Sequence, residues 1–330
     1  MILIRSWLLV LHIIRNKVIV LYDFLILKKF IMTTLYIIGN GFDIHHGLNS
    51  RYSDFCEYAK ENKPDVYRNV SNYLHISEKW IDFEEALEYL DIDSIFDDAG
   101  IYYVGYGAED WSDANHHSYQ WFMDETVKSL SEELYDFFIS WINIVDENID
   151  INKIRKLEIN KNSMFLNFYY TQTLEKVYCI SNVNHIHGEV GDCELALGHA
   201  WSNRKQIPIN GEDDDIRINQ GIEILNTYFG KTFKNCSKII DENKMFFQEL
   251  TEVNKIVILG HSLGSVDIPY FKEIKKHIME NTIWYCSYYG EDDHAAKKRA
   301  LIELGIKNPI LDSMESIAVK SITDSELTKV

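Results

Sequence analysis

Two glycines stand close together in Gly39-Asn40-Gly41-Phe42-Asp43, directly after a short apolar run and before a helical pattern. Glycines at such a strand-to-helix turn let a phosphate approach backbone N–H groups, which bind anions together with the helix N-terminus. The pattern predicts a loop that holds the phosphates of a nucleotide. The full G-x-G-x-x-G spacing is absent because Ile44 stands in its last position, so a tight turn capped by Asp43 is the alternative.

Two histidines alternate in Asn184-His185-Ile186-His187-Gly188. Alternate side chains of a strand share a face, so His185 and His187 are expected to point the same way, as acid–base catalysis or metal binding would require. No carboxylate pair or cysteine ligand stands nearby, so no metal is expected. His187, beside a glycine at a strand end, is the candidate general base because imidazole titrates near neutral pH. A hydrogen-bonded structural histidine is the alternative.

The segment Gly260-His261-Ser262-Leu263-Gly264 matches G-x-S-x-G, the turn that presents the nucleophile of α/β hydrolases. A catalytic triad needs its acid and its histidine on separate loops. The candidates that follow Ser262 are Asp292, Asp293 and His294, which stand in one cluster. We therefore predict that the Ser262 hydroxyl binds ligand or caps the following helix, and a serine hydrolase is the alternative.

Strands and helices alternate along most of the chain. Apolar runs predict strands at residues 35–38, 164–168, 184–188, 194–198, 255–259 and 282–288, with helical patterns between them, including one at 238–250. This alternation predicts an α/β fold with a Rossmann-like parallel sheet flanked by helices. Residues 61–160, approximately, are interpreted as a helical insertion after the first βα unit. We expect one α/β nucleotide-binding domain over residues 32–330.

The composition narrows the ligand class. The chain has 330 residues, 46% of them apolar, and a net charge of −18. The apolar content allows a packed core, and the acidic charge argues against general nucleic-acid binding, which needs clustered Lys and Arg. A small anionic ligand stays open because backbone N–H groups can hold a phosphate. Five scattered cysteines without a C-x-x-C are typical of a reduced, cytoplasmic protein.

The first 31 residues are apolar, but charged residues interrupt them, so no uncharged run reaches the roughly 18 residues of a membrane span. No small-residue cleavage site of a signal peptide follows them. We interpret Met32 as the natural start and residues 1–31 as an upstream extension. A membrane-surface helix is the alternative.

Taken together and in order, these motifs resemble the AbiH family of bacterial phage-defence proteins. The resemblance covers residues 34 to about 289. The segments that carry it are 37–43, 47–48, 52–55, 80–84, 167–171, 174–175, 186–188, 260–263, Asp267 and 270–271. It implies a role in abortive infection, in which an infected bacterium stops growing or dies before phage can spread.

A more distant similarity is to the sirtuin-like NAD-binding fold (sirtuin/DHS-like). That similarity implies NAD or a related nucleotide as ligand or substrate, with His187 as the base and Asn167 or Asp43 orienting the ribose or a water. The residues that it implies in nucleotide binding are Gly39, Asn40, Gly41, Phe42, Asp43, Thr171, Gly188, Gly260, Ser262, Leu263 and Asp267.

One residue departs from the AbiH pattern, which reads Asn-Phe-Asn-Tyr-Thr where this chain has Tyr169 in place of the second Asn. Asn167 lies two residues away on the same strand face and is the candidate to replace it. Three functions stay open: an effector that cleaves NAD or a related nucleotide, a serine hydrolase through Ser262, and a non-enzymatic nucleotide-bound sensor or toxin partner. A homo-oligomer or a phage-derived trigger also stays open.

Overall fold

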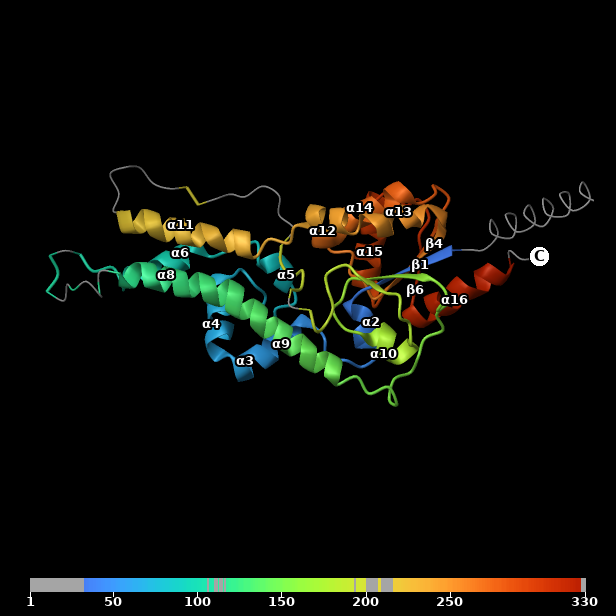
Figure 1. Ribbon diagram of the computed structural model, residues 1–330, viewed down its shortest axis with the longest axis horizontal. Helices are drawn as coiled ribbons and strands as arrows, with labels where there is room; N and C mark the ends of the chain where they lie inside the picture. Colours follow the sequence, from blue (N-terminus) through green and yellow to red (C-terminus); the bar gives the residue numbers. More distant parts are fainter. Residues whose placement is uncertain are drawn as a thin grey trace, which may run out of the picture.

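The computed structural model describes residues 33–327, apart from residues 106, 110–111, 113–114, 116, 193, 200–206 and 209–215. The predictions about residues 1–31 and Met32 therefore lie outside the described residues. Figure 1 shows a sheet covered by helices and, beside it, a helical lobe. Within the described ranges, no helix is both long and apolar enough to cross a membrane.

Six parallel strands form one sheet in the order β3-β2-β1-β4-β5-β6. The strands are β1 (Thr33–Ile38), β2 (Met164–Asn167), β3 (Asn184–His185), β4 (Val253–Leu259), β5 (Ile283–Ser287) and β6 (Ile310–Asp312). The chain builds the sheet outward from β1 to β3 and then continues with β4 on the other side of β1. The order reverses between β1 and β4, which is where dinucleotide-binding sheets of this topology hold their ligand. The predicted α/β fold with a parallel sheet is confirmed.

Both faces of the sheet are apolar because successive side chains of each strand point to opposite sides. On one face, Leu35 and Ile37 pack in a core shared with α13, α14 and α15. On the other face, Tyr36 and Ile38 pack in a core shared with α2, α10 and α16. The covering helices are α2 (Asn40–His45), α10 (Thr173–Tyr178), α13 (Lys244–Glu249), α14 (Ile268–His277), α15 (Glu291–Glu303) and α16 (Met314–Leu327).

The helical lobe has an apolar core of its own. Its helices are α3 (Tyr52–Asn62), α4 (Pro64–Tyr73), α5 (Phe83–Ala86), α6 (Ile92–Gly100), α8 (Ser118–Lys128), the π-helical turn η1 (Ser129–Glu133), α9 (Leu134–Glu147) and α11 (Ile216–Lys231). The first seven lie between β1 and β2, and α11 runs along α8 (Figure 1). The lobe thus starts before the expected boundary near residue 61 and includes a helix from after β3.

Two predicted elements differ from the structure, and one strand was not predicted. Residues 194–198 form a loop and no strand; Ala196 N donates to His187 O at 2.8 Å, but no ladder develops. The helix expected at 238–250 is divided at Asn243, whose side chain bonds back to Ile239 O, into α12 (Cys236–Glu242) and α13, followed by the short η2 (Leu250–Glu252). The strand β6 was not predicted, because it has three residues and all are half-buried.

The turn after β4 contacts the turn after β1 without room for a side chain. A Cβ at Gly260 would lie 2.1 Å from Phe42 N and 2.4 Å from Gly41 C, and Gly260 has a φ of +69°. We expect Gly260→Ala to lower the free energy of unfolding by more than about 2 kcal/mol, because a clash adds to the cost of a left-handed alanine. Gly47→Ala is the matched control, since Gly47 has a φ of +84° but no atom within 4 Å of an added Cβ. Urea denaturation of both variants tests this, and equal losses would contradict it.

Candidate functional site

The predicted phosphate loop is the turn between β1 and α2. Gly39 N donates to Leu259 O (3.1 Å), Gly41 N to Gly260 O (2.7 Å) and Phe42 N to Gly39 O (2.9 Å). A Cβ on Gly41 would lie 2.7 Å from the Cα of Gly260. Two of the amides expected to face a phosphate, those of Gly39 and Gly41, therefore join this turn to the end of β4 and the turn after it, and the third, that of Phe42, closes the turn on itself. The contact between the two turns explains why glycines stand here.

Asn40 and Tyr169 both fix the loop that follows α2. Asn40 Nδ2 donates to Ser50 O (2.8 Å), and Ser50 Oγ donates to Asn40 Oδ1 (2.6 Å). The hydroxyl of Tyr169 also donates to Ser50 O (2.6 Å). The residue that replaces the expected asparagine is thus a buried tyrosine with a structural hydrogen bond.

Asp43 is buried on α2, where its Oδ1 accepts hydrogen bonds from the hydroxyls of Thr171 and Thr173. Burial raises the pKa of the Asp43 carboxyl to about 6, although the two hydroxyls act in the opposite direction. This carboxyl therefore links the turn after β1 to the segment after β2.

Asp43 predicts a pH dependence of stability. Its folded pKa of about 6 lies above the ordinary value of 3.8, so the folded state binds more protons between these values. The contribution of this group to stability is complete below about pH 4 and is lost as the pH rises through about 6. Asp43→Asn mimics the protonated form, so we expect its stability relative to the parent to improve as the pH rises from about 4 to about 7. Urea denaturation across this range measures the difference, and a constant difference would contradict the prediction.

Asn167, the last residue of β2, holds the turn that follows the strand. Its Oδ1 accepts from Tyr169 N (2.9 Å), and its Nδ2 donates to Thr171 O (3.2 Å). The same Nδ2 lies 3.5 Å from His185 Nδ1. The amide of Asn167 thus contacts the ring of His185, which belongs to a different cluster from that of His187.

The two histidines after β2 serve different clusters. His185 Nε2 lies 2.9 Å from Glu175 Oε1, whereas His187 Nδ1 lies 3.1 Å from Phe168 O. The prediction that the two rings share a face is wrong, because β3 ends at His185 and a turn begins at Ile186.

His187 is 3% exposed. A backbone carbonyl can only accept, so Nδ1 donates to Phe168 O, and the neutral ring presents Nε2 as an acceptor. Nε2 has no hydrogen-bond partner among the described residues and lies 3.6 Å from Asp267 Oδ1. Burial and the nearby charge of Lys234 lower the pKa of His187 to about 3, against the effect of Asp267. His187 Nε2 is therefore a buried acceptor for which the described residues supply no donor.

Asp267, at the end of the short η3 (Ser265–Asp267), is the centre of a buried charge cluster. Lys234 Nζ lies 3.2 Å from Asp267 Oδ1 and 3.3 Å from Glu84 Oε2, and His261 Nε2 lies 3.3 Å from Asp267 Oδ2. Burial acts to raise the pKa of Asp267, but Lys234 and the two histidines hold it well below its usual range. Burial acts to lower the pKa of Lys234, but the two carboxylates raise it. Of this cluster, Asp267 and His187 were predicted from the sequence, and no local pattern marks Lys234.

A cavity of about 720 Å³ lies beside His187, between the lobe and the helix α12. Its wall includes His187, Gly188 and Lys234. This volume is in the range of small-molecule sites. Among the described residues, neither the glycine turn after β1 nor the turn after β4 lines this cavity. The predicted site residues therefore do not form one site. Those of the glycine turn pack against the turn after β4, whereas His187 and Gly188 line the cavity.

Ser262 is exposed, and its Oγ accepts a hydrogen bond from Gly264 N (3.3 Å). The left-handed residue of the turn is the buried Leu263, with a φ of 59°, so the strain falls on leucine and not on the serine. His261 Nδ1 accepts from Leu263 N (2.9 Å). The remaining triad candidates share the first turn of α15: Asp292, Asp293 and His294. The serine thus has a bond within its own turn, and its candidate partners stay on one helix.

A family model described as "Bacteriophage abortive infection AbiH" matches residues 35–288. The match begins in β1 and extends past β5, so it includes the helical lobe, His187 and the charge cluster. No curated protein and no solved structure matches the chain.

Proposed function

Because the chain belongs to the AbiH family of bacteriophage abortive-infection proteins, we propose that it is an anti-phage defence protein that binds and hydrolyses an NAD-like nucleotide beside His187. One observation carries most of the argument. His187 Nε2 and Asp267 Oδ1 lie 3.6 Å apart, and the buried Nε2 has no partner among the described residues. A ribose hydroxyl or a bound water would supply the donor that Nε2 needs, whereas Asp267 Oδ1 already accepts a hydrogen bond from Lys234 Nζ.

The position of the cavity supports a nucleotide. His187 follows β3 at the carboxyl edge of a sheet whose order is that of dinucleotide-binding proteins. Lys231 and Lys238 line the cavity and would contact phosphate groups, whereas the ammonium group of Lys234 is buried between Glu84 and Asp267. Lys231 also pairs with Glu132 (2.9 Å), and Lys238 pairs with Glu242 (3.7 Å). On binding a phosphate, each of these two lysines would leave its glutamate or contact both groups.

The proposed reaction is hydrolysis of the bond between ribose and nicotinamide. Water attacks C1′ of the ribose, the bond from C1′ to the ring nitrogen breaks, and its electron pair neutralises the departing nicotinamide. The proton of the water passes to His187 Nε2, and the carboxylate of Asp267 stabilises the imidazolium that forms. The pKa of about 3 keeps His187 neutral but makes it a weak base, so the proposed step requires the bound substrate to raise this pKa toward neutrality.

The test uses the purified full chain with NAD. Calorimetry would measure binding, and chromatography would follow the release of nicotinamide. Release at a rate that depends on protein concentration supports the proposal. Binding without release favours a nucleotide-bound sensor, the second candidate, which the structural role of Tyr169 at the position of the expected asparagine supports. Failure to bind contradicts both.

A further inference from the structure

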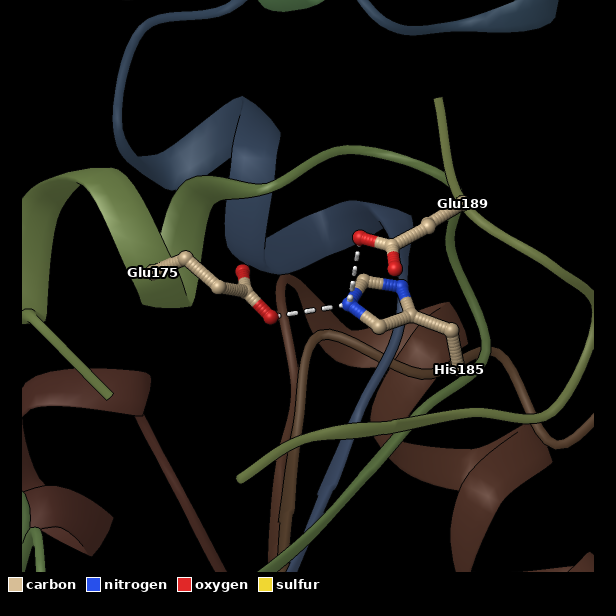
Figure 2. Close-up of side chains that lie close together, drawn as sticks. All are labelled: Glu175, His185 and Glu189. Atoms are coloured by element: carbon tan, nitrogen blue, oxygen red, sulfur yellow. Dashed lines mark hydrogen bonds and ion pairs between the residues drawn. The ribbon is translucent and has the colours of Figure 1, made fainter. Parts of the chain in front are cut away.

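We propose that Glu175, His185 and Glu189 form a site for a divalent transition-metal ion such as Zn²⁺ or Mn²⁺. Figure 2 shows the ring of His185 between the two carboxylates, with Glu175 on α10 and Glu189 in the segment after β3. The inference does not depend on the proposed nucleotide, because none of these three residues belongs to the cluster around His187.

The ligand atoms already converge. His185 Nε2 lies 2.9 Å from Glu175 Oε1 and 3.8 Å from Glu189 Oε2, and all three atoms lie within 4.8 Å of one another. An ion bound at 2.0–2.1 Å in tetrahedral geometry separates its ligand atoms by roughly 3.3 Å. The two distances from His185 lie on either side of this value, so small side-chain movements would close the site.

Neighbouring groups hold the ligands in place. Gln172 Nε2 donates to Glu189 Oε2 (2.8 Å), while Asn167 and the backbone of Tyr169 contact the ring of His185. Such outer contacts are typical of metal ligands, because they fix the orientation of a ring or carboxylate. Asn167, a predicted catalytic residue, thus becomes a positioning residue for this second site.

In the described part of the chain, no lysine or arginine pairs with the carboxylates of Glu175 and Glu189, which face His185. Glu175 Oε2 is buried and has no hydrogen-bond partner among the described residues. A buried carboxylate oxygen without a partner is costly, and a cation beside both carboxylates removes that cost.

The donor set indicates the class of ion. One imidazole and two carboxylates suit Zn²⁺, Mn²⁺ and related ions better than Ca²⁺, which prefers six or more oxygen ligands. Three protein ligands leave a coordination position for water or for an oxygen of a bound molecule. The side chain of Glu189 is 40% exposed, so an ion can reach the site from solvent.

No local pattern predicted a metal, because no carboxylate pair stands beside the two histidines in the sequence. The fold supplies the pair: Glu175 comes from the helix before β3 and Glu189 from the turn after it. Glu175 and Glu189 are separated along the chain, so the sequence does not show that their carboxylates lie close together in the fold.

The test is a titration of the full chain, without an affinity tag and after removal of metal by a chelator, with ZnCl₂ in a calorimeter. We expect one equivalent of zinc to bind and Glu189→Gln to weaken the affinity by at least about tenfold. Glu189 is partly exposed, so this variant should fold like the parent. Glu273→Gln is the matched control, because Glu273 Oε1 also lies 3.0 Å from a histidine, His277, but in a pair on α14.

Substitution with Co²⁺ provides a second measurement, since its visible absorption reports the ligands directly. We expect a signal from the parent and from Glu273→Gln, and a reduced signal from His185→Gln. Three results would overturn the proposal: no saturable zinc binding by the parent, equal affinity in Glu189→Gln, or an equal loss in Glu273→Gln. Binding of Ca²⁺ as tight as that of Zn²⁺ would overturn the assignment to a transition metal.

Discussion

Replacing Lys234 with methionine is expected to lower the free energy of unfolding by about 3–5 kcal/mol. The ammonium group of Lys234 is buried between the carboxylates of Glu84 and Asp267, at 3.3 and 3.2 Å. Methionine fills a similar volume but leaves the two carboxylates without their shared cation. Since a domain is stable by only about 5–15 kcal/mol, this loss would remove a large fraction of the total.

An exposed ion pair provides the control. Lys276 Nζ lies 2.6 Å from Glu273 Oε2 on α14, and the side chain of Lys276 is 69% exposed. Lys276→Met should change the free energy of unfolding by less than about 1 kcal/mol, because water screens the pair. Urea denaturation of both variants gives the comparison. If Lys234→Met were as stable as Lys276→Met, the buried cluster would not depend on its lysine.

The variant His187→Asn is expected to lose nucleotide hydrolysis by about 10²–10⁴-fold, and protection against phage with it, while remaining folded. Asparagine places its amide nitrogen near the position of Nδ1, so it can keep the hydrogen bond to Phe168 O. It cannot replace Nε2, the atom that faces Asp267 and would accept the proton. Release of nicotinamide and plaque counts on cells that express the variant measure the two losses.

Thermal melting with and without nucleotide separates a chemical effect from a structural one. His277→Asn is the matched control, since His277 lies on α14 and pairs with Glu273. It should keep full activity. A His187→Asn protein that melts like the parent, binds nucleotide and still protects cells would rule out the catalytic role. That result would favour the nucleotide-bound sensor.

Much of the sheet could be predicted because its strands are buried on both faces. Val253–Leu259 and the shorter β1 read as apolar runs, and each ends at a glycine that marks the turn. The strand β6 gives no such signal, since its residues are half-buried. Residues 194–198 give a strand signal without forming a strand. Their alternating apolar residues line the cavity and pack on the lobe.

The site was harder to predict because its partners are distant in the sequence. His187 stands beside a recognisable glycine turn, so a local pattern identified it, whereas Asp267 was named through the family resemblance. Lys234 comes 150 residues after Glu84, in the segment between α11 and α12, and only the folded chain brings its ammonium group to Glu84 on α5. The glycine turn was assigned to phosphate because its sequence fits that role. In the structure its amides bond to the turn after β4, a contact that no local pattern reveals.

The strand order has a consequence for synthesis of the protein. Thr33 of β1 pairs with Val253 of β4, which the ribosome adds 220 residues later. During most of translation, β1 therefore lacks its neighbour β4. Contacts between residues so far apart in the sequence form late in folding. A fragment that stops before β4 would also lack His261 and Asp267, so it could not assemble the cluster around His187. Translation itself would delay assembly of the cluster around His187, and fragments released by an interrupted ribosome would lack the proposed hydrolytic activity.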